Sequence, residues 1–169
     1  MGTTEPIIRS ATPDDLDAIG VIYAHHVLTG VATFEVDPPD GPEWGRRFGT
    51  IVDSGLPFLA AEIGGVVVGY AYCVQWKLRP AYRHTVEDSV YLAPEAAGRG
   101  IGGRLLDGLL VRCSDAGVRQ VIAVIADSDA YASLALHRNR GFVDAGRLIS
   151  VGFKHGRWLD TLLLQRSLS

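Results

Sequence analysis

The segment from Thr85 to Leu110 constrains the fold more than any other part of the sequence. A β-rich run, TVEDSVYL, is followed by four glycines within residues 98–103 and then by leucines at helical spacing. A glycine-rich turn that opens a helix leaves backbone N–H groups uncovered at the positive end of the helix dipole. The segment therefore predicts a strand–turn–helix unit that holds a phosphate group, with Glu87 in the strand beside it.

Length and charge narrow the class of protein. The 169 residues fit one domain, residues 1–169, with a sizeable core. A net charge of −3 argues against nucleic acid or an anionic membrane as a partner. No CxxC or HExxH pattern occurs, so we expect no metal, and Cys73 and Cys113 lie in apolar runs typical of reduced core thiols. Because the N-terminus lacks an apolar signal core and no run approaches the ~20 apolar residues of a membrane span, we expect a cytoplasmic protein.

Periodicity predicts a mixed α/β (α+β) fold with the order β-α-α-β-β-β-α-β-α-β-β. Thr12 is the expected N-cap of the first helix, and His25 and His26 are expected at its surface end. The further expected elements are a helix around residues 44–51, a hairpin of 57–63 and 66–74 joined by Gly-Gly, a buried central strand at 118–126, a helix at 130–140, and strands at 148–153 and 158–164. Residues 30–41 are predicted to form a loop beside a binding site, with Phe34 either lining a pocket or packing in the core.

The glycine turn also fits a dinucleotide-binding pattern. Gly98, Gly100 and Gly103 have the spacing G-x-G-x-x-G, and Asp127 follows 24 residues after Gly103, near the end of the next strand. However, five residues separate the preceding strand from the glycines, and an antiparallel hairpin precedes both. A nicotinamide-dependent oxidoreductase is therefore the weakest alternative. A Walker A motif is excluded because Gly103 is followed by Arg-Leu.

An acyl-CoA fits the whole segment better. Its pyrophosphate suits the helix N-terminus, and the two amides of its pantetheine arm can pair with an open strand edge like an additional strand. The strand before the turn supplies such an edge only if it splays away from its neighbour in the sheet. The acyl thioester would then lie beside Val90 and Glu87.

At this level of detail the chain resembles the GNAT family of N-acetyltransferases, within it the enzymes that acetylate phosphinothricin and methionine sulfoximine. The resemblance covers nearly the whole chain and rests on TPDDL at 12–16, TVEDSVY at 85–91, the glycines at 98–102, LHRNRGF at 136–142 and GRWLD at 156–160. It implies a mostly antiparallel sheet with a splayed central strand pair and helices on both faces. It further implies acetyl-CoA as cosubstrate, the α-amine of a small amino acid or analogue as acceptor, direct transfer in a ternary complex, a role in herbicide or antibiotic resistance, and a homodimer in which the C-terminal segments meet.

The resemblance also assigns residues. For the cofactor it implies the backbone of Val90, Tyr91 and Leu92, the amides of Gly98, Arg99, Gly100, Ile101, Gly102 and Gly103, and the side chains of Asp129 and Ser133. Around the substrate it implies Asp88 and Ser89 on one side and Lys77, Leu78 and Arg79 on the other. Arg79 is the expected anchor for a carboxylate, since its guanidinium has a fork of donors. Phe34, Trp76 and Tyr82 are expected either to shape the pocket or to pack in the core.

Two positions depart from the family pattern. Ala97 stands where the family usually has Gln or Arg, which should leave the backbone amides and thus cofactor binding intact. Residues 127–132, DSDAYA, lack the Asn that commonly contacts the cofactor there, and Asp129 is taken as its equivalent.

Acetyl transfer to an ammonium requires a general base, support for a developing oxyanion and a proton for the leaving thiolate. Glu87 is the expected base, directly or through a water, although a strand carboxylate can also face solvent or pair with an arginine. A backbone N–H near Val90 is the expected oxyanion donor. His137 occupies the position of the family's usual tyrosine acid and either donates this proton or only packs against the cofactor, while Tyr131 is expected at the helix surface. A non-catalytic acyl-CoA-binding regulatory module remains the alternative outside the enzymes.

Overall fold

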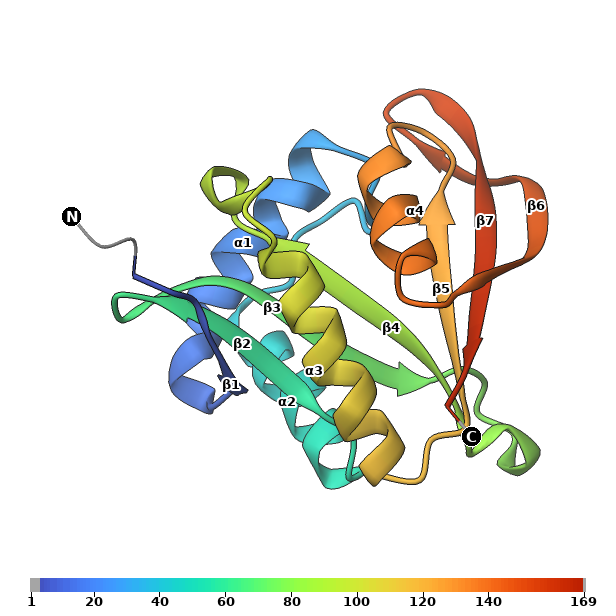
Figure 1. Ribbon diagram of the computed structural model, residues 1–169. Coiled ribbons are helices and arrows are strands. Elements are labelled where there is room, and N and C mark those ends of the chain that lie inside the picture. The colour runs from blue at the N-terminus through green and yellow to red at the C-terminus, as the bar shows by residue number, and fades with distance from the viewer. Residues whose placement is uncertain (1–3, 169) are drawn as a thin grey trace.

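The structure is a computed structural model that describes residues 4–168. Its main elements appear in Figure 1. The helices are α1 (Leu16–Thr29), α2 (Gly41–Asp53), α3 (Ile101–Asp115) and α4 (Tyr131–Arg138). The strands are β1 (Ile7–Ser10), β2 (Phe58–Ile63), β3 (Val66–Gln75), β4 (Thr85–Leu92), β5 (Gln120–Ala126), β6 (Val143–Lys154) and β7 (Arg157–Ser167). Three short 3-10 turns, η1 (Pro13–Asp15), η2 (Pro80–Tyr82) and η3 (Pro94–Ala96), complete the order.

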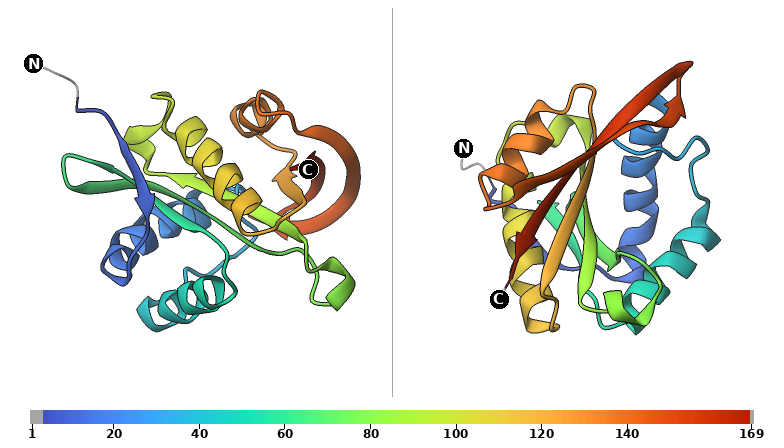
Figure 2. Two further views of the ribbon diagram at one scale, coloured as in Figure 1. Left: turned by 60° about the horizontal axis from the view of Figure 1, so that its bottom comes forward. Right: turned by 90° about the vertical axis from the view of Figure 1, so that its right-hand side faces the viewer.

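A single seven-stranded sheet organises these elements in the order β1-β2-β3-β4-β5-β7-β6. Every neighbouring pair is antiparallel except β4 and β5, which are parallel. Helices α1 and α2 cover one face and α3 and α4 the other, as the turned views of Figure 2 show. The predicted element order, the mixed α/β class and the mostly antiparallel sheet are confirmed.

The sheet opens at its centre. Strands β4 and β5 pair only from Thr85–Gln120 to Glu87–Ile122, although β4 continues to Leu92 and β5 to Ala126. The predicted splayed strand pair is therefore present, and the two strands diverge directly after Glu87. The diverging arms are visible in Figure 1 between the β4 and β5 labels.

Both faces of the sheet are closed by apolar packing. On one face Trp44 of α2 and Tyr23 of α1 meet edge to face, with ring centroids 5.4 Å apart. On the other, Leu105 and Leu109 of α3 are completely buried. Burial of each such side chain contributes about 1.5–3 kcal/mol, so both faces of the β1–β4 part of the sheet are firmly packed up to the opening. Cys73 and Cys113 are buried free thiols, as predicted.

Residues 30–40 contain no helix or strand, as predicted for the loop at 30–41. Side chains fix this loop: Arg47 pairs with Glu35, and the buried Lys154 ammonium donates to the Thr33 carbonyl at 2.7 Å. The chain differs from the sequence prediction in two strands. Strand β6 starts at residue 143, earlier than expected. Strand β5 alternates buried and half-buried residues instead of being buried on both faces, and its residues 123–126 line the opening. In the described part of the chain no helix is long and apolar enough to cross a membrane.

Candidate active site

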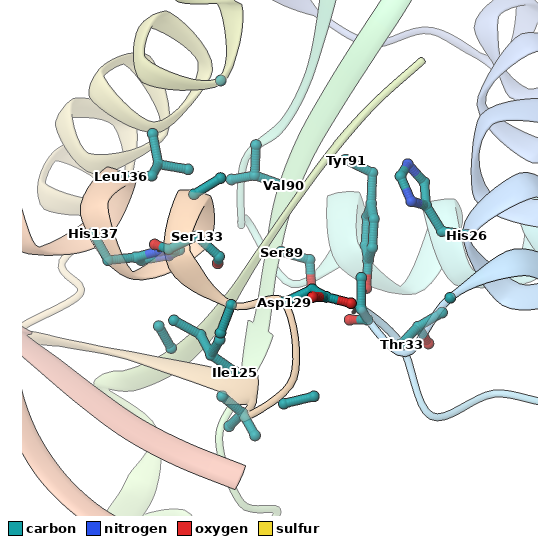
Figure 3. Close-up of a pocket in the computed structure, with 18 of the residues that line it drawn as sticks. His26, Thr33, Ser89, Val90, Tyr91, Ile125, Asp129, Ser133, Leu136 and His137 are labelled. Atoms are coloured by element: carbon teal, nitrogen blue, oxygen red, sulfur yellow. Dashed lines mark hydrogen bonds between the residues drawn. The ribbon is translucent and has the colours of Figure 1, made fainter. Parts of the chain in front are cut away.

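A cavity of about 720 Å³ fills the opening between β4 and β5. Its walls are β4, the end of β5, the N-terminus of α3, helix α4 and the loop that follows α1. Figure 3 shows the two sides of this cavity, with His137, Ser133 and Leu136 on the α4 side and Tyr91, His26 and Thr33 on the α1 side. The cavity runs from the glycine turn along β4 to Glu87, and its part along β4, from Leu92 to Glu87, is about 17 Å long for five residues at the usual strand rise.

The hydrogen-bond pattern shows which backbone groups of β4 face this cavity. The amide of Ala93 donates to Val68 and that of Trp76 to Thr85, so the odd-numbered residues of β4 pair with β3. The N–H and C=O groups of Val90 and Leu92 point the other way, toward the opening. The backbone of Tyr91, also predicted to bind the cofactor, points to β3 instead, because Tyr91 and Tyr70 form one of these hydrogen-bonded pairs.

His26 was predicted to lie at the helix surface, and the structure corrects this. Its ring reaches from α1 to the end of β4, where Nε2 lies 2.7 Å from the Leu92 carbonyl oxygen. Since a carbonyl only accepts, Nε2 carries the hydrogen. His26 thus binds one backbone acceptor, the Leu92 carbonyl, on the open edge of β4. The N–H of Leu92 and the N–H and C=O of Val90 still face the opening. Burial lowers the pKa of His26, which keeps the ring neutral near pH 7. No local sequence pattern predicts this contact, because it joins residues that are 66 positions apart.

The glycine turn ends at the N-terminus of α3 as predicted. Gly100 adopts a left-handed conformation, φ +76°, as the N-cap residue, a geometry that favours glycine. The first intrahelical bond there runs from Arg104 N–H to the Gly100 carbonyl, so the N–H groups of Ile101, Gly102 and Gly103 lack helical acceptors. Gly103 has a second reason to be glycine, since a Cβ there would lie 2.2 Å from the Arg140 guanidinium.

The remaining predicted cofactor residues divide into two groups. Asp129 and Ser133 line the cavity, and Asp129 has φ +52°, an uncommon value outside glycine. The side chain of Ile101 is buried in the core and that of Arg99 is exposed, and neither lines the cavity. Only their backbone groups remain candidates for phosphate binding.

Glu87 lies at the apex of the opening, in the last pair of β4 with β5, and lines the cavity. Burial raises the pKa of its carboxyl, and the neighbouring charge of Asp88 adds to this, while Lys77 opposes it. A carboxylate with a raised pKa is a better proton acceptor, so the environment expected for a general base is present. Ser89, on the same face of β4, also lines the cavity.

Asp88, predicted to face the substrate with Glu87, lines the same cavity but lies on the other face of β4. Successive strand residues point to opposite faces, so the side chain of Asp88 turns toward α4. There Oδ2 lies 2.7 Å from Nε2 of His137, while Nδ1 of His137 bonds the Ser133 carbonyl at 2.8 Å. Burial of the ring lowers the pKa of His137, but the hydrogen bond and charge of Asp88 outweigh burial and raise it above its ordinary value.

The aromatic and basic segment after β3 is less closely involved than expected. Trp76 is partly buried, Lys77 and Arg79 are exposed, and Leu78 is 92% exposed. All four lie outside the cavity lining, although Lys77 is near enough for its charge to act on Glu87.

The aromatic candidates take separate places. Phe34 lines the cavity and presses its ring against Gly152 of β6. Tyr82 is partly exposed in η2, outside the cavity, and Tyr131 is 87% exposed, as predicted. Residues 4–168 contain no group of three or more potential metal ligands.

Comparison with known proteins gives matches that agree on one family. Residues 22–142 match the model of the Acetyltransferase (GNAT) family. A phosphinothricin N-acetyltransferase of Alcaligenes faecalis is 53% identical over 96% of this chain and 82% of its own length. An L-methionine sulfoximine/L-methionine sulfone acetyltransferase of Pseudomonas aeruginosa is 37% identical over 95% of this chain and 94% of its own.

A solved structure agrees in fold. A GNAT superfamily phosphinothricin acetyltransferase from Sinorhizobium meliloti, in complex with acetyl-CoA, superimposes with a TM-score of 0.93 at 49% identity. The match covers 97% of this chain and 89% of the other.

Proposed function

Because this chain belongs to the GNAT family of acetyltransferases, we propose that it moves an acetyl group from acetyl-CoA to the α-amine of a small amino acid or analogue such as phosphinothricin or methionine sulfoximine. Direct transfer in a ternary complex is part of the proposal. The observation that carries it is the open edge of β4, which ends at Glu87 on one side and at a helix N-terminus on the other.

The residues present fit acetyl-CoA. The uncovered N–H groups of residues 101–103 suit a pyrophosphate, and the C=O of Val90 and the N–H of Leu92 suit the two amides of pantetheine. Asp129 and Ser133 are proposed as further contacts from the α4 side of the cavity. When bound, acetyl-CoA supplies the activated acyl thioester.

Glu87 is the proposed base. It takes a proton from the substrate ammonium, directly or through a water, and its raised pKa suits this task near neutral pH. The amide of Val90, which points into the opening, is proposed to support the negative charge that develops on the thioester oxygen. His137, which lines the same cavity, is proposed as the acid for the leaving thiolate.

The amino-acid carboxylate requires a cation near the amine. Lys77 is the cation whose charge reaches Glu87, and Arg79 follows two residues later in the same exposed segment. We place the carboxylate on this side of Glu87, with Ser89 and Phe34 on the cavity wall. Closure of the segment from Trp76 to Arg79 on substrate binding is part of this proposal, because these side chains lie outside the cavity lining.

A homodimer is proposed through the C-terminal hairpin. Strand β6 is the edge of the sheet, and it exposes several large apolar side chains together with one from β7, namely Val143, Leu148, Ile149, Val151, Phe153 and Trp158. A row of exposed apolar residues on an edge strand is typical of an interface. A cytoplasmic location fits the two free thiols.

Binding and turnover together test this function. Thermal unfolding with acetyl-CoA or with NAD(H) separates the acetyltransferase from the oxidoreductase, since we expect only acetyl-CoA to raise the Tm. Initial rates of CoA release with varied acetyl-CoA and amine should give intersecting double-reciprocal lines. Parallel lines would contradict direct transfer, and acetyl-CoA binding without CoA release for any amine would indicate a regulatory module instead.

A further inference from the structure

We propose that Asp88 is a positioning residue that keeps a proton between itself and His137, so that the two side chains act as one acid for the leaving thiolate. This inference rests on the proposed acid role of His137 and adds the residue on which that role depends. The pair joins β4 to α4, with 1% of the Asp88 side chain and 6% of the His137 side chain exposed, and both residues line the cavity.

The hydrogen bonds of the ring fix where its protons are. Nδ1 faces the Ser133 carbonyl at 2.8 Å, and because a carbonyl only accepts, Nδ1 carries a hydrogen. A neutral ring would then have a bare lone pair on Nε2, facing Oδ2 of Asp88 at 2.7 Å. Two acceptors cannot form this contact, so a proton lies between them. It makes His137 an imidazolium beside the Asp88 carboxylate, in line with the raised pKa of His137, and the pair is neutral overall.

The surroundings favour retention of this proton. Oδ1 of Asp88 is buried and has no hydrogen-bond partner among residues 4–168, so an ionised Asp88 depends on His137 for its stabilisation. The thiol of Cys73 lies opposite Asp88 in β3, and Glu87 adds negative charge from the other face of β4. Arg140, at the end of α4, opposes protonation of His137, but its guanidinium is paired with Asp107.

The chemistry balances with one proton from the pair. When the carbon–sulfur bond breaks, the ring must turn so that Nε2 leaves Oδ2 of Asp88 and gives its proton to the sulfur, because both ring nitrogens face acceptors of the protein in this structure. Neutral His137 and the Asp88 carboxylate then remain, with one net negative charge. The amine nitrogen loses two protons in each turnover, through Glu87 or solvent. One restores the pair and the other is released, as the overall reaction of an ammonium to an amide and a thiol requires. A pKa above the ordinary histidine value brings the donor closer to that of a thiol, which is about 8.5.

Asp88→Asn is the direct test, since asparagine keeps the shape and can donate to Nε2 but carries no charge. In the protein without ligands, ¹⁵N NMR of the imidazole should show wild-type His137 protonated on both nitrogens at pH 7, and a neutral ring with hydrogen on Nδ1 in the variant. The alkaline limb of the pH profile of kcat should move to lower pH in Asp88→Asn, with the loss of turnover smallest at acidic pH and the Kd for acetyl-CoA within about threefold of wild type.

Asp15→Asn is the matched control, because it removes the charge of another buried aspartate, one paired with Arg9 outside the cavity. It should leave the pH profile and the His137 resonances unchanged. A neutral His137 in the wild type at pH 7, with its hydrogen on either nitrogen, would overturn the proposal, as would an equal loss of kcat at every pH in Asp88→Asn. The NMR result does not depend on turnover, so failure of the proposed function, seen as no CoA release by the wild type, is a separate outcome.

Discussion

Substitution of Glu87 by glutamine should separate activity from stability. The side chains have the same size, the strand pairing of Glu87 with Val74 and Ile122 involves only backbone, and no hydrogen bond or ion pair of the carboxylate is found within residues 4–168. Only base strength and charge therefore change. General bases accelerate reactions by roughly 10²–10⁴-fold. Because water can replace the base in part, we expect kcat to fall by about 10- to 1,000-fold, which corresponds to a rise of about 1.4–4.1 kcal/mol in the activation barrier.

Stability should move in the opposite direction. Burial raises the pKa of Glu87 in the folded state above its unfolded value, so the ionised carboxylate disfavours folding once the pH rises through the folded pKa. The glutamine variant lacks this penalty. Its Tm at pH 7 should equal or exceed that of the wild type, and the difference should vanish at pH values below about 4.3, the unperturbed pKa of glutamate, where both carry a neutral side chain.

Steady-state CoA release from pH 5 to 9, together with thermal unfolding at the same pH values, measures both effects. Wild-type kcat/KM should fall tenfold per pH unit below the raised pKa of Glu87, and the variant should lack this acidic limb. Glu95→Gln, at an exposed position in η3, serves as the matched control and should change neither quantity. Unchanged turnover of Glu87→Gln on the pH plateau would refute the base assignment, and a lower Tm at pH 7 would refute the account of its burial.

Three further substitutions test other parts of the site. Gly102→Glu should raise the Kd for acetyl-CoA, measured by calorimetry, at least 100-fold, because it places bulk and negative charge at the N-terminus of α3. Wild-type affinity in this variant would contradict the assignment of this turn as the phosphate site. His26→Ala should raise the KM for acetyl-CoA about 3- to 10-fold with little change in kcat, since it removes the hydrogen bond of about 1 kcal/mol that holds the end of β4 to α1. An unchanged KM would show that this contact is dispensable. Asp15→Asn should lower the free energy of unfolding by about 1–3 kcal/mol at pH 7, because Arg9 holds the pKa of Asp15 below its usual value. This stabilisation is complete above the unfolded pKa and disappears as the pH falls through the folded pKa, so wild type and variant should converge in acid, and a constant difference would contradict the pairing.

The sequence was sufficient for the fold and for the backbone parts of the site. Hydrophobic period and turn residues predicted every helix and strand in order, because each of these signals is local. The glycines before α3 predicted the uncovered amides for the same reason: left-handed backbone and close packing both select glycine at defined positions. The need for an open edge on β4 also followed from the chemistry of a pantetheine arm, and the structure confirmed the opening.

The partners in long-range contacts could not be predicted from the sequence. The alternation of β4 implies that Asp88 and Glu87 face opposite sides, but the identity of the partner of Asp88 depends on α4, which lies 49 positions away in the chain. His26 likewise reaches the end of β4 only because α1 packs against the sheet there. The segment from Trp76 to Arg79 lies outside the cavity lining. Its proposed substrate contacts therefore require a movement that neither its composition nor its spacing encodes.

The most direct test of the central claim is identification of the product by mass spectrometry. Purified protein with acetyl-CoA and a panel of L-amino acids, L-phosphinothricin and L-methionine sulfoximine should yield an N-acetylated amine and one CoA thiol per product molecule for at least one member. Glu87→Gln should form the same product at least tenfold more slowly. Acetyl-CoA binding with no acetylated product from any of these amines would contradict the assignment of this site as an amino-acid N-acetyltransferase.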